Sequence, residues 1–108
     1  MTLRTSTGDV LAGDVEVARN VWTRFKGLML RRQLPPALLI HKCSSVHTFF
    51  MRHPIDVAFC AADGAVLRIY PALRPWRATR FVRGAKYAVE TPAGALGSVE
   101  AGAKLIWS

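Results

Sequence analysis

Short apolar runs, separated by turn-forming residues, are the feature that most limits what this chain can fold into. Roughly six or seven such runs follow one another at spacings of about 8–12 residues, a pattern typical of small β-sandwiches and barrels. They do not alternate with helices as in a doubly wound sheet, and no glycine-rich phosphate-binding loop is present. We therefore predict that residues 1–108 form a single mainly β domain, a small sandwich or barrel of jelly-roll character.

Turn and helix signals place individual elements within this fold. Asp63-Gly64, between two apolar runs, predicts a β-hairpin, and Gly8-Asp9 predicts another between residues 3–7 and 10–17. Apolar side chains at three- and four-residue intervals predict one short helix over 21–31, which Pro35-Pro36 would end. Further strands are predicted at 38–40, 55–60, 86–90 and 105–107.

The charge balance is strongly basic. Fifteen Lys and Arg face seven Asp and Glu, which gives a net charge of +8. Because 51% of the residues are hydrophobic, the chain is not a disordered basic tail. No apolar stretch approaches the roughly 20 residues that a membrane-spanning helix needs.

One segment concentrates the positive charge. Its basic residues recur at every third position, the period of an extended polyproline-type loop. They are Arg74, Arg77, Arg80, Arg83 and Lys86. The segment is either a solvated loop or an anion-binding rim for phosphate, nucleic acid or an acidic protein.

The two cysteines, Cys43 and Cys60, are too few for a disulfide framework and lie in apolar surroundings, so we expect structural thiols. The amino terminus shows no apolar run of signal-peptide length. Both observations lead us to expect a cytoplasmic protein. No sequence motif predicts a cofactor.

The histidines offer a weak metal-ligand pattern. His41, His47 and His53 are six residues apart, and Cys43 lies nearby. A straight strand through all of them is interrupted before Pro54, and no fourth ligand has standard spacing. We predict no metal site.

A nucleophile–base pair can also be drawn in this region. Cys43 or Ser45 near His47, with Asp56 to orient the imidazole, is a permissible arrangement. The Gly-x-Ser-x-Gly turn of serine hydrolases is absent.

The most informative segment is the polar and aromatic run over residues 47–56. Arg52 and Asp56 within it either form a salt bridge, or Arg52 faces a cleft and presents its guanidinium to a carboxylate or phosphate. Phe50, Met51 and Trp76 would then form the apolar wall of that cleft.

Five sequence blocks, taken in order, match a known pattern. They are Arg24-Phe25-Lys26-Gly27-Leu28-Met29-Leu30-Arg31, His47-Thr48-Phe49-Phe50-Met51-Arg52-His53-Pro54-Ile55-Asp56, Asp63-Gly64-Ala65-Val66, Pro75-Trp76-Arg77 and Glu90-Thr91-Pro92-Ala93-Gly94. Together they resemble the domain of unknown function 192 family, small prokaryotic proteins also described as an ancient conserved region. The resemblance covers residues 15–107.

This resemblance implies a compact, mainly β domain but no mechanism, because no function is established for the family. The family's closing Gly-Asp pair stands here as Gly102-Ala103, so no carboxylate role is carried over at that end. Many relatives carry a secretion or lipoprotein signal, and this sequence shows none. The pocket candidates that the resemblance implies are Gly27, Met29, Phe50, Met51, Arg52, Asp56, Trp76, Arg77 and Glu90.

The leading hypothesis is a non-enzymatic binding or accessory protein. It would hold a small anionic ligand or an acidic peptide between the 47–56 block and the 75–77 loop. The expected ligand-binding residues are His47, Phe50, Met51, Arg52, Asp56, Trp76, Arg77 and Glu90. One alternative is association with single-stranded nucleic acid through Arg74, Arg77, Arg80, Arg83 and Lys86. A second is a hydrolase that uses His47 and Asp56, and the sequence leaves the oligomeric state open.

Overall fold

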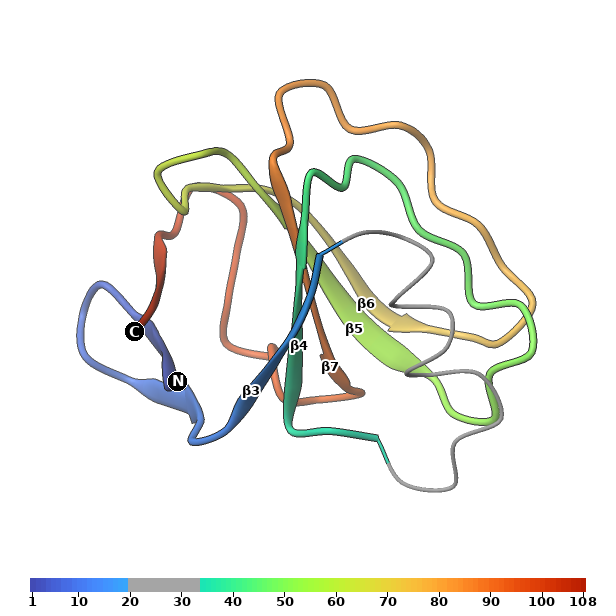
Figure 1. Cartoon of the computed structure of the whole chain (residues 1–108), viewed down its shortest axis with the longest axis horizontal. Coiled ribbons are helices and arrows are strands. Elements are labelled where there is room, and N and C mark those ends of the chain that lie inside the picture. Colours follow the sequence, from blue (N-terminus) through green and yellow to red (C-terminus); the bar gives the residue numbers. More distant parts are fainter. Residues whose placement is uncertain (20–33) are drawn as a thin grey trace.

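The computed structural model describes residues 1–19 and 34–108, and in these residues the protein is built from two β-sheets (Figure 1). The smaller sheet has three antiparallel strands in the order β2-β1-β8. Its strands are β1 (Leu3–Thr5), β2 (Val10–Ala12) and β8 (Leu105–Trp107). The larger sheet has five strands in the order β3-β4-β7-β5-β6. These are β3 (Val15–Ala18), β4 (Ala37–His41), β5 (Ile55–Cys60), β6 (Val66–Leu73) and β7 (Tyr87–Pro92).

The predicted mainly β, sandwich-like architecture is confirmed. None of the described residues lies in a helix, and the helix predicted over 21–31 falls outside the described residues. Within the described residues, therefore, no helix is long and apolar enough to cross a membrane. Both predicted hairpins are present, with Gly8 and Gly64 at positive φ in their turns.

Two features of the strand pairing differ from the prediction. The prediction of a single strand over 10–17 is wrong. The strand is interrupted at Gly13-Asp14, where the chain passes from β2 in one sheet to β3 in the other. In addition, β3 pairs with β4 in parallel, with Val15 opposite Ala37 and Ala18 opposite Ile40. This parallel pair departs from the all-antiparallel strands of a jelly roll.

The larger sheet is buried on both faces at its centre. All six residues of β5 are buried, and their side chains alternate between two clusters, as successive residues of a strand must. Ala58 and Cys60 pack toward the three-stranded sheet together with Leu3 and Leu105. Ile55, Val57 and Phe59 pack on the opposite face, in a cluster that also holds residues from the long connections of the chain.

Two of these long connections lie side by side over the larger sheet (Figure 1). One follows β4 and spans residues 42–54, and the other joins β6 to β7 and spans residues 74–86. Backbone hydrogen bonds connect them: Val82 N donates to Ser44 O (2.8 Å) and Thr79 N to Val46 O (2.9 Å). His47 and Ala78 form an isolated antiparallel bridge. We call this pair of segments the paired loops; their contact brings the aromatic run over 47–56 next to the basic segment over 74–86.

Candidate functional site

Thr48 anchors the site within the paired loops. This polar residue is completely buried. Its hydroxyl donates to the carbonyl oxygen of Arg74 (2.6 Å) and accepts from the backbone N–H of Arg77 (2.9 Å). Its own main chain donates to Arg77 O (2.8 Å) and accepts from Trp76 N (3.0 Å). Thr48 therefore fixes the turn that carries Trp76.

Four rings gather above this anchor, and we call them the aromatic cluster: His47, Phe49, Phe50 and Trp76. The ring of Phe49 stacks on that of His47 with 4.8 Å between centroids, and Trp76 lies 4.7 Å from Phe50 and 6.0 Å from Phe49. Trp76 is nevertheless 55% exposed and Phe50 44%. The rings thus pack on one another while much of their surface faces solvent.

Backbone strain coincides with the two most exposed rings of the cluster. Phe50 has a φ of 65° and Trp76 a φ of 64°. For bulky side chains this left-handed region is rarely occupied and costs of order 1–3 kcal/mol per residue. The hydrogen bonds around Thr48 hold this unfavourable conformation in place. Strain of this kind gathers at functional sites more often than elsewhere.

Arginines flank the aromatic cluster. Arg52 follows Phe50 by two residues, and Arg74 and Arg77 lie on either side of Trp76 in the chain. All three side chains are exposed. A guanidinium stays charged at any physiological pH and can bind a carboxylate or phosphate with two parallel hydrogen bonds.

The carboxylate of Asp56 is held by backbone amides. One oxygen accepts from Ala72 N (2.8 Å), and the other accepts from Gly94 N (2.9 Å) and Leu96 N (3.0 Å). Asp56 is only 2% exposed, whereas Arg52 is exposed. Asp56 therefore joins β5 to β6 and to the turn after β7, and offers no exposed carboxylate for a ligand.

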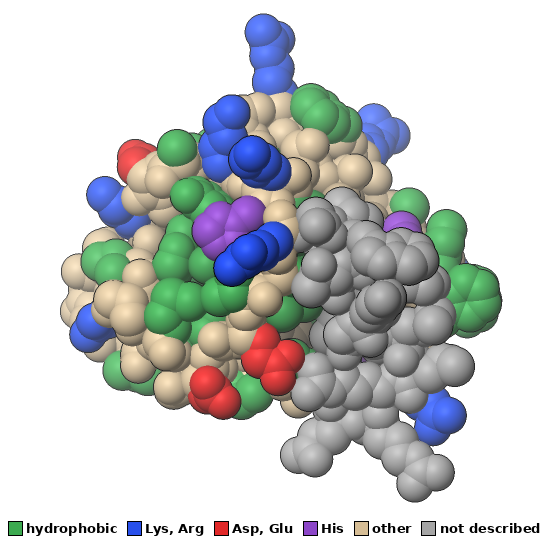
Figure 2. All heavy atoms as spheres, in the orientation of Figure 1, with side chains coloured by type: hydrophobic (Ala, Val, Ile, Leu, Met, Phe, Trp, Pro, Cys, Tyr) green, Lys and Arg blue, Asp and Glu red, His purple; other side chains and the backbone are tan. Residues whose placement is uncertain are grey.

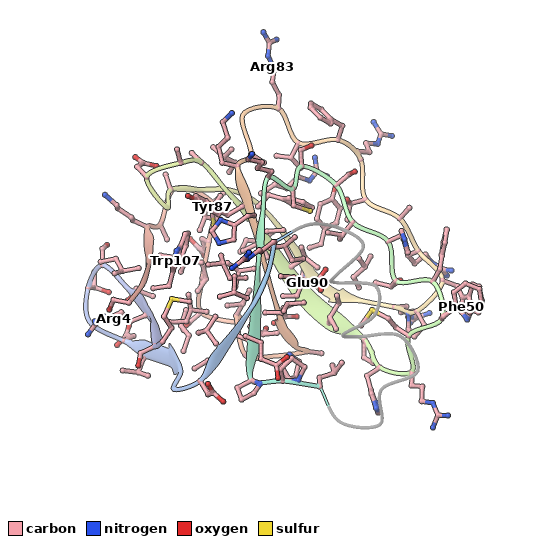
Figure 3. The ribbon with its side chains drawn as sticks, in the orientation of Figure 1. Arg4, Phe50, Arg83, Tyr87, Glu90 and Trp107 are labelled. Carbon is pink, nitrogen blue, oxygen red and sulfur yellow. The ribbon has the colours of Figure 1, made fainter. Side chains whose placement is uncertain are left out.

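The structure separates the expected ligand-binding residues into two groups. His47, Phe50, Arg52, Trp76 and Arg77 belong to the paired loops and are at least partly exposed. The other three are buried: Met51, Asp56 and Glu90. Glu90, near the centre of Figure 3, lies on β7 and lines a small pocket with Leu38 and Ile55, whereas Phe50 lies at the edge of the molecule.

None of the described residues that line the small pocket beside Glu90 belongs to the paired loops. Larger hollows lie elsewhere: one runs from Leu67 to Pro71 along β6 and faces residues 96–101, and another lies between the Asp63-Gly64 turn and β8. Neither is lined by a residue of the aromatic cluster. Figure 2 shows hydrophobic side chains projecting at the edge where Figure 3 places Phe50.

The basic segment does not converge on the aromatic cluster. All five of its cationic side chains are exposed: Arg74, Arg77, Arg80, Arg83 and Lys86. Figure 3 shows Arg83 projecting from the top of the molecule, far from Phe50 at the side. A small anion at the aromatic cluster would therefore meet only the arginines at one end of the segment.

The structure gives other contacts to Cys43, His47 and Asp56, the side chains considered for a nucleophilic mechanism. Both cysteines are buried, and the thiol of Cys43 donates to Ser45 O (3.2 Å). Burial, with a smaller contribution from Asp63, raises the pKa of Cys60 to about 12 and keeps its thiol protonated. The imidazole of His47 accepts from Phe49 N through Nδ1 (3.3 Å), while Asp56 serves backbone amides. Across residues 1–19 and 34–108 no three His, Cys, Asp or Glu side chains gather as metal ligands.

Comparison with known proteins places the chain in a family. The family model for DUF192, an uncharacterized ancient conserved region, matches residues 2–107. The chain belongs to the DUF192 family. The resemblance inferred from the five sequence blocks is thereby confirmed. Of these blocks, the structure describes the four that follow residue 33, whereas Gly27 and Met29 fall outside the described residues.

Two relatives are similar to nearly the whole chain. A UPF0127 protein of Thermococcus sibiricus is 36% identical over 99% of this chain and 74% of its own length. A UPF0127 protein of Pyrococcus furiosus is 37% identical over 98% of this chain and 97% of its own length.

Solved structures share the fold. A protein of unknown function from Novosphingobium aromaticivorans superposes with a TM-score of 0.81 at 20% identity, covering 98% of this chain and 82% of the other. A candidate transcription regulator from Sinorhizobium meliloti superposes with a TM-score of 0.75 at 28% identity, covering 97% and 89%.

Proposed function

We propose that the protein is a non-enzymatic binding or accessory protein that holds an anionic group, on a small ligand or an acidic peptide, against the aromatic cluster. The observation that carries this proposal is the pair of strained, exposed rings, Phe50 and Trp76, flanked by exposed arginines. Exposed aromatic surface beside guanidinium groups suits a partner with both apolar and anionic parts.

The residues have different roles in this proposal. Arg52 and Arg77 bind the anion, and His47, Phe50 and Trp76 form the apolar contact surface. Met51, Asp56 and Glu90 are buried, so they contribute to the fold and do not contact the anion. A cytoplasmic location is part of the proposal and rests on the presence of only two cysteines, both buried, which are too few for a disulfide framework.

Arg52→Ala is expected to abolish stabilisation by an anion while leaving the fold intact, because the Arg52 side chain is exposed. The measurement is the shift in Tm on adding a hexaglutamate peptide or inorganic pyrophosphate. Arg83→Ala, which removes an equally exposed charge far from the aromatic cluster, is the matched control and should keep the shift. If Arg52→Ala unfolds the protein, or if both variants keep the same shift, the proposed binding site is wrong.

A second candidate function is association with single-stranded nucleic acid. It is favoured by the exposure of all five basic side chains between Arg74 and Lys86, with Trp76 and Phe81 exposed between them. Bases stack on exposed aromatic rings, and phosphates bind along a basic track. The structural likeness to the Sinorhizobium meliloti candidate transcription regulator points in the same direction.

Binding to oligothymidylate should then weaken steeply with salt. If all five cations contact phosphates, a plot of log K against log salt concentration has a slope of about −3.5. Arg83→Ala should reduce that slope by about 0.7, since one phosphate contact is lost. No retention of the protein on immobilised oligothymidylate at low salt would exclude this function.

A further inference from the structure

The aromatic cluster has the features of a surface that contacts a lipid bilayer. It projects at an edge of the molecule, where Figure 3 shows Phe50 pointing away from the body of the domain. It combines exposed Phe and Trp side chains with arginines close by in the chain. Trp and other amphipathic rings prefer the membrane–water interface, where the ring contacts acyl chains while its polar atoms remain near the headgroups.

The exposure of the two rings at an edge of the molecule suits a flat partner such as a bilayer. Small ligands bind in concave sites that bury most of their surface. Two hollows in the part of the chain that the structure describes, along β6 and beside β8, are lined by residues outside the aromatic cluster. A projecting pair of rings, by contrast, can enter the interfacial layer without any concavity in the protein.

Charge complementarity identifies the kind of bilayer. The chain carries a net charge of +8, and Arg52, Arg74 and Arg77 are exposed around the cluster. Each basic residue near an acidic bilayer contributes about 1 kcal/mol of attraction. A neutral bilayer offers no such gain, and two partly exposed rings alone provide little apolar area to bury.

The strained backbone contributes rigidity to this surface. The hydrogen bonds of Thr48 hold Trp76 in a single turn conformation before any partner arrives. Binding then loses less conformational entropy than it would with a flexible loop.

We propose that the aromatic cluster docks onto an acidic lipid bilayer, with Phe50 and Trp76 in the interfacial layer and Arg52, Arg74 and Arg77 at the headgroup phosphates. This inference rests on the proposed function, because the headgroup phosphate is the anion that the site holds. It adds the source of that anion.

The first experiment is co-sedimentation of the full chain with vesicles. Vesicles of phosphatidylcholine alone should leave the protein in the supernatant, whereas vesicles that also contain phosphatidylglycerol should pellet it, and added salt should reverse this. Replacing both rings in the Phe50→Gly, Trp76→Gly variant should weaken partitioning at least about tenfold. Glycine adopts positive φ without strain, so this variant is expected to keep the turn.

The matched controls use the same loop. Phe81→Ala removes a ring that is 73% exposed but lies outside the aromatic cluster, and it should leave partitioning unchanged. Arg77→Ala should weaken partitioning more than Arg83→Ala, because Arg83 projects from a different part of the molecule.

A second measurement reports on the depth of Trp76. The chain has three tryptophans, so fluorescence quenching by dibrominated phosphatidylcholine is compared between the unmodified protein and Trp76→Phe. We expect the tryptophan fluorescence of the unmodified protein to be quenched and that quenching to be lost in Trp76→Phe. This variant should still pellet with the vesicles.

Several outcomes would overturn the inference. If the Phe50→Gly, Trp76→Gly variant pellets as well as the unmodified protein but Arg83→Ala pellets less, the protein adsorbs electrostatically and its rings do not insert. Stabilisation by hexaglutamate through Arg52, without any vesicle binding, would reject the bilayer and leave the proposed function standing. If hexaglutamate does not stabilise the protein and vesicles do not bind it, both the bilayer and the proposed function are rejected.

Discussion

Replacing Asp56 with alanine is expected to lower the free energy of unfolding by about 3–5 kcal/mol. The substitution removes the acceptors of three backbone N–H groups, those of Ala72, Gly94 and Leu96. A buried N–H group left without an acceptor lowers the free energy of unfolding by about 1–3 kcal/mol. Water can replace the lost acceptor only where the segment is exposed. The measurement is urea unfolding followed by circular dichroism.

Asp56→Asn provides a graded comparison. Its single amide oxygen can replace one carboxylate oxygen, but its NH2 group then faces backbone donors at the other. Asp56→Asn should therefore lower the free energy of unfolding by less than Asp56→Ala does. The control is Asp63→Ala, since Asp63 also accepts from a backbone amide, Ala65 N at 3.0 Å, but is exposed. Equal losses for Asp56→Ala and Asp63→Ala would contradict the structural role assigned to Asp56.

Gly64→Ala is expected to be comparably damaging, with a loss of at least about 3 kcal/mol. Gly64 has a φ of 89° in the turn between β5 and β6, and a Cβ at this position would overlap the carbonyl oxygen of Leu105. The same glycine accepts from Leu105 N (2.9 Å), so this contact joins the larger sheet to β8 of the smaller one. Relieving the overlap would separate the two sheets at this point.

Gly8→Ala is the matched control for Gly64→Ala. Gly8 also has a positive φ, of 103°, in a hairpin turn, but a Cβ there meets no atom within 4 Å. Only the backbone penalty remains, of order 1 kcal/mol. The difference between the two variants, measured by urea unfolding, isolates the close approach of Gly64 to Leu105. Equal losses would show that this approach carries no energetic weight.

Local sequence signals predicted the local parts of this fold. The Asp63-Gly64 hairpin and the strands at 55–60 and 105–107 match β5, β6 and β8, because turn chemistry and apolar runs are properties of neighbouring residues. The passage from β2 to β3 at Gly13-Asp14 was not predicted, because the residue pattern of a strand does not indicate the sheet to which the strand belongs. The parallel pairing of β3 with β4 was missed for the same reason.

In the candidate site, too, the sequence predicted local features better than contacts between distant residues. The sequence singled out the 47–56 block and the 75–77 loop, and the structure places them in direct contact. The hydrogen bonds of Asp56 could not be predicted from the sequence, because its partners, Ala72, Gly94 and Leu96, lie 16, 38 and 40 residues away in the chain. The role of Thr48 had one weak signal, a small polar residue inside an aromatic run. The positive φ of Phe50 and Trp76 had none, because glycine or asparagine normally marks that conformation.

The antiparallel pairing of β1 with β8 brings the two ends of the chain together. Thr2 N donates to Ser108 O (2.8 Å) and Ser108 N to Thr2 O (3.2 Å), and Figure 1 shows both ends on the side of the molecule away from the paired loops. An affinity tag or surface linker attached at either end would therefore leave the aromatic cluster facing outward. The same geometry allows a short peptide to join residue 108 to residue 1, so that the chain could be reopened in an exposed turn such as Gly97-Ser98 while the eight strands of the described residues keep their partners.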